Sequence, residues 1–176
     1  EREVFELPRV IQDVYDLYLE SARAKNIELH WHLARTLPPF VFGDPSRLRQ
    51  ILSNLVDNAV KFTERGRIEL HASAEGGDLI RFAVHDSGIG IAADKQKMIF
   101  EAFAQADGTT SRKYGGTGLG LSISREIAGL LGGQIALKSQ AGEGSTFTLY
   151  LPFAYAPRVF PANSGVGQAG PDHLTF

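Results

Sequence analysis

Two short glycine-rich stretches place flexible backbone beside a polar side chain. The first is HDSGIGI at residues 85–91, and the second is YGGTGLGLSIS at residues 114–124. Glycines at alternate positions let the backbone turn through positive φ and approach a ligand closely, and successive exposed N–H groups in such turns bind anions. Asp86 is the polar residue of the first stretch and Thr117 that of the second. Together the two stretches indicate a nucleotide site, in which backbone amides hold phosphates and the carboxylate reads the base.

Neither stretch belongs to the commonest phosphate-binding motifs. The sequence contains no GxxxxGK[ST], which excludes a P-loop. No GxGxxG follows an early strand, which excludes the usual dinucleotide-binding fingerprint. Each stretch taken separately is equally compatible with an ordinary glycine turn, so the interpretation depends on a third element.

That third element is a predicted helix with an unusual polar stripe, DPSRLRQILSNLVDNAVKFT at residues 44–63. Asp44 suits the N-cap and Pro45 the first helical position. Asn54, Asn58 and Lys61 follow at i, i+4 and i+7 and share one face. An amide oxygen can bind Mg²⁺ and a lysine can hold phosphate; the alternative is a solvated helix face. The opposite, apolar face carries Leu48, Leu52, Leu55, Val56 and Ala59.

Five motifs in a fixed order carry a family resemblance. They are NLVDNAVKFT (54–63), DSGIG (86–90), IFEAF (99–103), GGTGLGLSIS (115–124) and GEGSTFTLYLP (142–152). Over about residues 3–153 the chain resembles the catalytic ATP-binding (CA, HATPase) domain of a sensor histidine kinase, within the gyrase/Hsp90/histidine-kinase/MutL superfamily. FEAFAQAD followed by RKYGGTGLGLSIS is most similar to kinases of the hybrid type, which carry receiver domains further along the chain.

These motifs lead us to expect specific roles around ATP and Mg²⁺. Asp86 is expected to accept the hydrogen bond of the adenine amine, and Asn58 to be the protein ligand of Mg²⁺. Asn54 is expected to support the same metal or its waters, and Lys61 to reach a phosphate. The amides that open the helix after residue 118 are expected to meet the triphosphate. The expected nucleotide-binding set is Asn54, Asn58, Lys61, Asp86, Gly88, Gly90, Ile91, Phe100, Phe103, Tyr114, Gly116, Thr117, Gly118, Leu119 and Gly120.

Residues 92–118 have weak periodicity, and a loop of this length in a compact domain is usually functional. We expect a lid over the nucleotide, packed by Phe100 and Phe103. Arg112 and Lys113 are expected on the γ-phosphate and, with Asn54 and Lys61, in catalysis; the alternative is that both are ordinary loop charges. Tyr114 is compatible either with positioning the lid or with stacking near the base.

The amino-acid composition limits the class of protein and the partners to be expected. The chain has 176 residues, 43% of them hydrophobic, a net charge of −2 and no cysteine. This balance gives no sign of nucleic-acid binding, and no apolar run approaches a membrane span, so we expect neither nucleic acid nor membrane as a partner. We expect a cytoplasmic fragment of a longer protein, with an ATP-binding domain over residues 1–155 and a linker or disordered tail over 156–176.

The hydrophobic pattern predicts the elements that position these motifs. The fold expected is a two-layer α/β sandwich (the Bergerat ATP-binding fold), with a mixed sheet of about five strands packed on three helices. Helices are predicted near residues 8–25, 44–63 and 119–131, and strands near 27–34, 67–75, 79–87, 134–140 and 145–152, after a short extended start.

The function expected is transfer of the ATP γ-phosphoryl group to a histidine on a separate dimerisation domain, with a response-regulator receiver domain downstream. None of the five histidines lies in the helical setting where the family keeps its phosphoacceptor. His30 and His32 share a strand face, which is weak evidence for a metal site and more typical of exposed strand residues. The alternatives are a non-catalytic ATP-binding or docking module of a degenerate kinase, or a superfamily ATPase or serine kinase.

Overall fold

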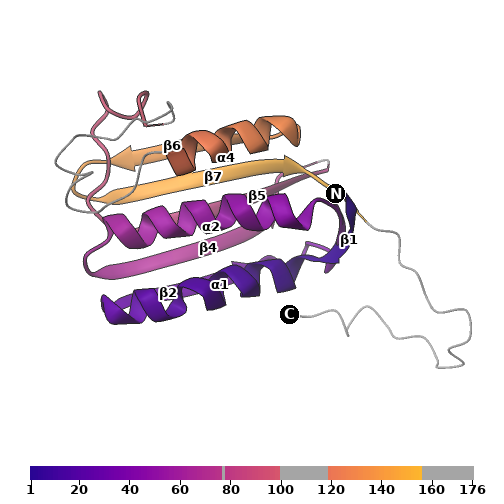
Figure 1. Ribbon diagram of the computed structural model, residues 1–176, viewed down its shortest axis with the longest axis horizontal. Helices are drawn as coiled ribbons and strands as arrows, with labels where there is room; N and C mark the ends of the chain where they lie inside the picture. Colours follow the sequence, from indigo (N-terminus) through magenta and orange to yellow (C-terminus); the bar gives the residue numbers. More distant parts are fainter. Residues whose placement is uncertain (77, 100–118, 156–176) are drawn as a thin grey trace, which may run out of the picture.

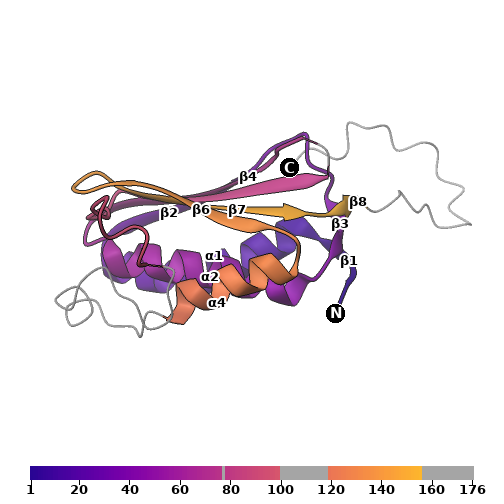
Figure 2. The same ribbon diagram turned by 90° about the horizontal axis from the view of Figure 1, so that it is seen from above.

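The computed structural model describes residues 1–76, 78–99 and 119–155 of the chain. In that part, helices α1 (Leu7–Ala24), α2 (Pro45–Phe62) and α4 (Leu119–Leu130) lie side by side on one face of a five-stranded sheet. Figure 2 shows the two layers edge-on, with the helices on one side of the sheet. The predicted two-layer α/β sandwich is confirmed.

The five-stranded sheet has the order β2-β4-β5-β7-β6. Its strands are β2 (Ile27–Leu33), β4 (Gly66–Ala74), β5 (Leu79–Asp86), β6 (Gln134–Gln140) and β7 (Gly144–Pro152). β2 and β4 are parallel, and every other pair is antiparallel, so the sheet is mixed as predicted. Alternate residues face the helices, which buries Ile68 and Leu70 of β4 and Ile80 and Phe82 of β5.

The helix starts follow the local sequence. α1 begins with a proline in its first turn and buries Val10, Ile11 and Val14. α2 also has a proline in its first turn, and the Asp44 side chain caps it by accepting a hydrogen bond from the Arg47 N–H at 3.1 Å. Such a cap stabilises a helix by about 1 kcal/mol. The predicted bounds of these helices differ from the observed ones by one residue at each end.

A second, three-stranded sheet was not predicted. It consists of β1 (Glu3–Glu6), β3 (Phe40–Gly43) and β8 (Ala154–Tyr155), in the order β1-β3-β8. These strands are too short to show a period of their own, and they join segments that are far apart in the sequence. Phe5 and Phe153 meet there edge to face at 6.0 Å between ring centroids, which extends the hydrophobic core under this sheet.

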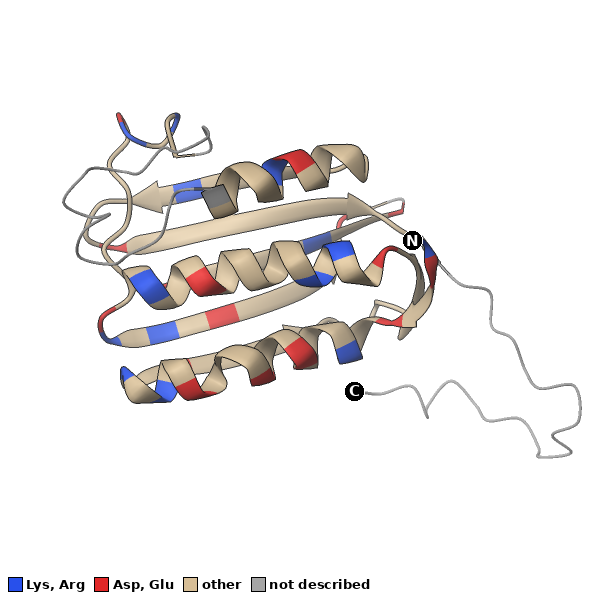
Figure 3. Ribbon diagram, viewed as in Figure 1, with Lys and Arg blue, Asp and Glu red and all other residues tan. Residues whose placement is uncertain are grey.

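Acidic and basic residues are interspersed along α1 and α2 (Figure 3). Of the predicted lid, only residues 92–99 belong to the described part of the chain, and turns cover residues 93–99. The rest of the lid and the predicted tail lie outside it. Within the described ranges, no helix is both long enough and apolar enough to cross a membrane.

Candidate functional site

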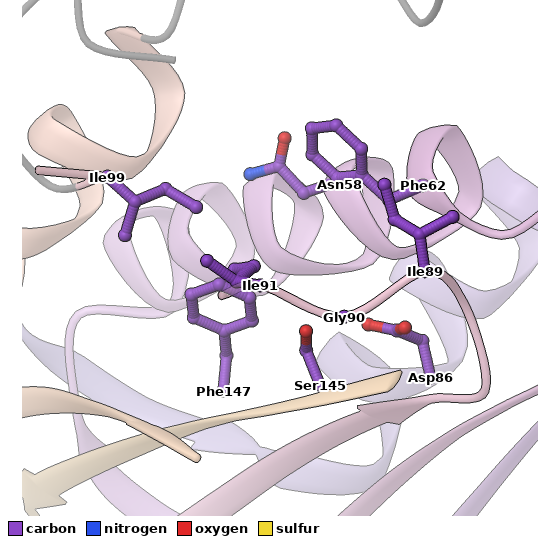
Figure 4. A pocket seen from close by; sticks show the side chains of 9 residues that line it. All are labelled: Asn58, Phe62, Asp86, Ile89, Gly90, Ile91, Ile99, Ser145 and Phe147. Carbon is purple, nitrogen blue, oxygen red and sulfur yellow. The ribbon is translucent and has the colours of Figure 1, made fainter. Parts of the chain in front are cut away.

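A pocket lies between the C-terminal half of α2 and the neighbouring ends of β5 and β7 (Figure 4). One wall comes from α2, and the floor comes from the sheet and from the loop that follows β5. The pocket is lined by Asn58, Phe62, Asp86, Ile89, Gly90, Ile91, Ile99, Ser145 and Phe147. An apolar cavity with a few polar groups is the usual form of a small-molecule site.

Asp86 supplies the carboxylate of this pocket. It is the last residue of β5 and is only 3% exposed. Its Oδ1 accepts a hydrogen bond from the Gly88 N–H at 2.9 Å. Burial raises the pKa of the Asp86 carboxyl above its ordinary value, while the N–H groups of Gly88 and Ser145 and the nearby His85 oppose that rise. Such a group accepts a hydrogen bond from a ligand in a place where water competes poorly.

The polar residues predicted on one face of α2 have different surroundings in the structure. Asn58 lines the pocket one helical turn before Phe62. The Asn54 amide instead donates to the Gly120 carbonyl at 3.3 Å and to Ser124 Oγ at 2.9 Å, which ties α2 to the start of α4. Lys61 forms an ion pair with Asp57 at 2.9 Å and is not among the residues lining the pocket.

Two glycines of the DSGIG motif leave no room for a side chain. A Cβ atom on Gly88 would lie 2.9 Å from Asp86 Oδ1 and would press on the Phe62 carbonyl oxygen. Gly90 has a φ of +69°, and a Cβ there would meet the Gln140 carbonyl. The motif therefore needs glycine for close approach at both positions and for its backbone conformation at Gly90.

Side chains of the β6–β7 hairpin hold the pocket wall that follows this motif. Ser139 Oγ accepts a hydrogen bond from the Ile91 N–H at 2.8 Å and lies 2.8 Å from Ser145 Oγ. The Gln96 amide donates to the carbonyls of Ile91 and Ser139 at 2.9 and 3.0 Å. These contacts hold Ile91 at the pocket and join the segment after β5 to the β6–β7 hairpin, which is distant in sequence.

The structure thus brings together Asn58, Asp86, Gly90 and Ile91 of the predicted set in one pocket. The N–H of Gly88 donates to Asp86, and the Asn54 amide contacts Gly120 at the start of α4. Leu119 is the first residue of α4. The following predicted residues lie outside the described part of the chain: Phe100, Phe103, Arg112, Lys113, Tyr114, Gly116, Thr117 and Gly118.

Sequence reasoning missed Phe62, Ile89, Ile99, Ser145 and Phe147 as pocket residues. All five belong to the motifs already recognised: Phe62 to NLVDNAVKFT, Ile89 to DSGIG, Ile99 to IFEAF, and Ser145 and Phe147 to GEGSTFTLYLP. Ser145 and Phe147 alternate along β7 and so share one face. That alternation was the signal that could have placed them beside Asp86, which pairs with Ser145 across the sheet.

The donor set fits a magnesium ion that arrives with phosphates. Within the described ranges no cluster of three or more His, Cys, Asp or Glu residues could hold a metal. Mg²⁺ keeps several waters and is usually held by one or two protein oxygens together with substrate phosphates. The single amide of Asn58 at the pocket meets that requirement.

Comparison with known proteins agrees with this geometry. Residues 43–155 match the model of the family described as histidine kinase-, DNA gyrase B- and HSP90-like ATPases. The hybrid signal transduction protein dokA of Dictyostelium discoideum is 44% identical over 176 residues, or 92% of this chain and 10% of that protein. The sensor protein GacS of Pseudomonas syringae is 43% identical over 151 residues, or 84% of this chain and 17% of that protein. The chain thus spans well under a quarter of these relatives.

Solved structures show the same fold. Full-length ShkA, crystallised with AMPPNP, has a TM-score of 0.81 and 38% identity over 90% of this chain and 32% of that chain. The catalytic domain of the histidine kinase ThkA has a TM-score of 0.73 and 32% identity over 86% of this chain and 95% of that chain. Family match, sequence identity and fold lead to one conclusion: the chain belongs to the histidine kinase-, DNA gyrase B- and HSP90-like ATPases, as a catalytic ATP-binding domain of the histidine-kinase kind.

Proposed function

We propose that this domain binds ATP with Mg²⁺ and donates the γ-phosphoryl group to a histidine on a separate dimerisation domain. The observation that carries the proposal is the buried Asp86 carboxylate on the floor of an apolar pocket, opposite the α2 wall with Asn58. A planar base fits between Phe62, Ile89, Ile91 and Phe147, and its amine donates to Asp86. Guanine presents a carbonyl at the same position and would leave Asp86 facing another acceptor.

The remaining residues are assigned to the phosphate end of the nucleotide. Asn58 holds Mg²⁺ through its amide oxygen, and Asn54 supports the same region while fixing the start of α4. A bound Mg²⁺ neutralises charge on the phosphates. Lys61 reaches a phosphate after exchanging its ion pair with Asp57, and the amides around Gly120 hold the triphosphate. Arg112 and Lys113 are assigned to the γ-phosphate on sequence grounds alone.

Transfer to a protein histidine is favoured over hydrolysis by the residue at position 54. ATPases of the superfamily are expected to carry a glutamate there, which activates water as a general base. An asparagine amide cannot accept a proton in that way. Catalysis by this chain then consists mainly of positioning and charge stabilisation, which is typical of phosphoryl transfer.

The partners proposed are the dimerisation domain that carries the acceptor histidine and a receiver domain downstream. Names of relatives support this setting: dokA is a hybrid signal transduction protein, and ThkA has been crystallised with the response regulator TrrA. A domain that uses ATP in such a pathway is proposed to work on the cytoplasmic side of the membrane.

Two measurements on the purified chain test this function. Titration calorimetry with Mg²⁺ should show ATP and ADP binding about ten- to a hundredfold more tightly than GTP, because GTP leaves a buried acceptor unpaired. With γ-labelled ATP and a separately supplied dimerisation domain, label should appear on that domain in an acid-labile, base-stable form. Equal affinity for ATP and GTP would contradict the role of Asp86.

The same assay separates the alternatives. ATP binding without transfer would make the chain a non-catalytic binding or docking module. Fast release of free phosphate would indicate an ATPase, and acid-stable label on the added protein would indicate a serine kinase.

A further inference from the structure

Thr63 carries a buried hydroxyl beside the pocket that the proposed function does not use. It follows the last residue of α2, is 0% exposed, and its Oγ1 has no hydrogen-bond partner within the part of the chain that the structure describes. Buried polar side chains nearly always have a partner, either protein or water. An orphaned hydroxyl at this place therefore requires a physical cause.

The hydroxyl and the Asp86 carboxylate converge on one corner. A Cβ on Gly88 would lie 2.9 Å from Thr63 Oγ1 and 2.9 Å from Asp86 Oδ1, and would also touch the Phe62 carbonyl oxygen. The neighbouring N–H groups are already used, because Gly88 donates to Asp86 Oδ1 and Ile89 donates to the Phe62 carbonyl. A threonine hydroxyl can donate and accept. The neighbouring oxygens of Phe62 and Asp86 are acceptors, so the Thr63 hydroxyl is placed to act as a donor.

We propose that Thr63 is a positioning residue for base recognition, whose hydroxyl reaches the Asp86 carboxylate through one buried water molecule and fixes the orientation in which it accepts the amine of the base. The inference rests on the proposed function. Two polar groups facing one buried site supply partners for an internal water. Thr63 is not among the residues lining the pocket, so it acts through Asp86.

Fixing the Asp86 carboxylate in this way should affect the selectivity for a base with an amine more than the general affinity for nucleotides. Hydrogen bonds to a charged carboxylate are roughly twice as strong as neutral ones, and they depend on direction. A carboxylate whose orientation is fixed by a hydrogen bond discriminates between a base with an amine and a base without one. A carboxylate that has lost this support can turn away, and the amine then contributes less to binding.

The test compares Thr63→Val with Thr63→Ser, using ATP and purine riboside triphosphate, which lacks the amine. Valine keeps the shape and removes the hydroxyl, whereas serine keeps the hydroxyl. Thr63→Val should bind ATP about tenfold more weakly and the analogue almost unchanged, so that the preference for ATP shrinks by the same factor. Thr63→Ser should retain the wild-type preference. The melting temperature of Thr63→Val should not fall, because the variant removes a buried hydroxyl that has no protein partner.

The outcomes separate this inference from the proposed function. If Thr63→Val keeps the wild-type ratio of affinities, or weakens both nucleotides equally, Thr63 is a structural residue only and the inference is overturned. If the wild-type chain binds no ATP, or binds ATP and the analogue equally, the base-reading role of Asp86 is wrong. The inference about Thr63 is then overturned as well, because it depends on that role.

Discussion

At the scale of single residues, Asp86 combines burial with a role proposed in base recognition. Its carboxylate is buried on the pocket floor and receives the N–H groups of Gly88 and Ser145, yet burial still raises the pKa of Asp86 overall. A carboxyl whose pKa is higher in the folded chain than in the unfolded chain favours folding below the unfolded pKa. That contribution is lost as pH rises through the folded pKa. Above its folded pKa, the ionised Asp86 therefore destabilises the fold.

Asp86→Asn should accordingly have opposite effects on stability and binding. The variant should melt at a higher temperature than the wild type at pH 7, and this difference should shrink as the pH falls through the raised pKa of Asp86. ATP affinity at pH 7 should fall about ten- to a hundredfold, because an amide is a weaker acceptor than a carboxylate. Thermal unfolding and calorimetry check the two halves. A variant that melts lower at pH 7 would contradict the pKa argument.

Asn58 is the second residue whose role can be isolated. Asn58→Ala should reduce phosphotransfer to a supplied dimerisation domain by at least about tenfold, because the only pocket-lining amide of α2 is lost. Nucleotide binding measured without metal should change far less. Gln50→Ala, at an exposed position of the same helix, is the matched control and should transfer normally. Unchanged transfer by Asn58→Ala would remove Asn58 from the metal site.

At the level of elements, the loop that follows β5 is fastened to the neighbouring β6–β7 hairpin. Ser139 and Gln96 fasten the segment after β5 to the β6–β7 hairpin. The N–H of Gly142 in the same hairpin donates to the Ile89 carbonyl at 2.6 Å. The position of Gly90 against the Gln140 carbonyl is therefore set by two elements at once.

A comparison of Gly90→Ala with Gly76→Ala should show how tightly the loop after β5 packs on the β6–β7 hairpin. Both glycines have positive φ, +69° and +83°, so each alanine carries a backbone strain of about 1–2 kcal/mol. Gly76 faces open space, whereas a Cβ at Gly90 meets the Gln140 backbone. Gly90→Ala should therefore lower the free energy of unfolding by roughly 1–3 kcal/mol more than Gly76→Ala, as expected for overpacking. Denaturant unfolding measures the difference, and equal losses would show that the hairpin can move away.

At the scale of the whole molecule, the described histidines lie away from the pocket. His30, His32, His71 and His85 are exposed and alternate with buried residues of β2, β4 and β5, so they face away from the helices. His85 is closest in sequence to Asp86, but its ring contacts Thr146 at 2.8 Å. His173 lies outside the described residues.

The isolated chain should therefore bind ATP without phosphorylating itself. Incubation with γ-labelled ATP should leave it unlabelled and release phosphate slowly, since position 54 carries an amide instead of a general base. Addition of a dimerisation domain with its acceptor histidine provides the positive control. Acid-labile label on the isolated chain would contradict the expectation and would point to one of its five histidines.

The sequence by itself determined the three helices, the five long strands and the motifs that meet at the pocket. Each of these carries a local signal: a helical or strand period, an N-cap such as Asp44, or glycines whose spacing suits a ligand. The place of Asp86 near the end of β5 followed from the same reasoning, because a strand was predicted near residues 79–87 and DSGIG begins at Asp86.

Only the tertiary structure decided the contacts between distant segments. The three-stranded sheet joins residues that are far apart in the sequence, and its two- and four-residue strands are too short to show a period. The Asn54 amide reaches Ser124, 70 positions later, so its stripe on α2 could not reveal that it holds α4. Thr63 ends a recognised motif, but only the fold shows that its hydroxyl and the Asp86 carboxylate both lie beside Gly88. Local periodicity places a residue on a face; which residue lies opposite depends on the packing of the whole chain.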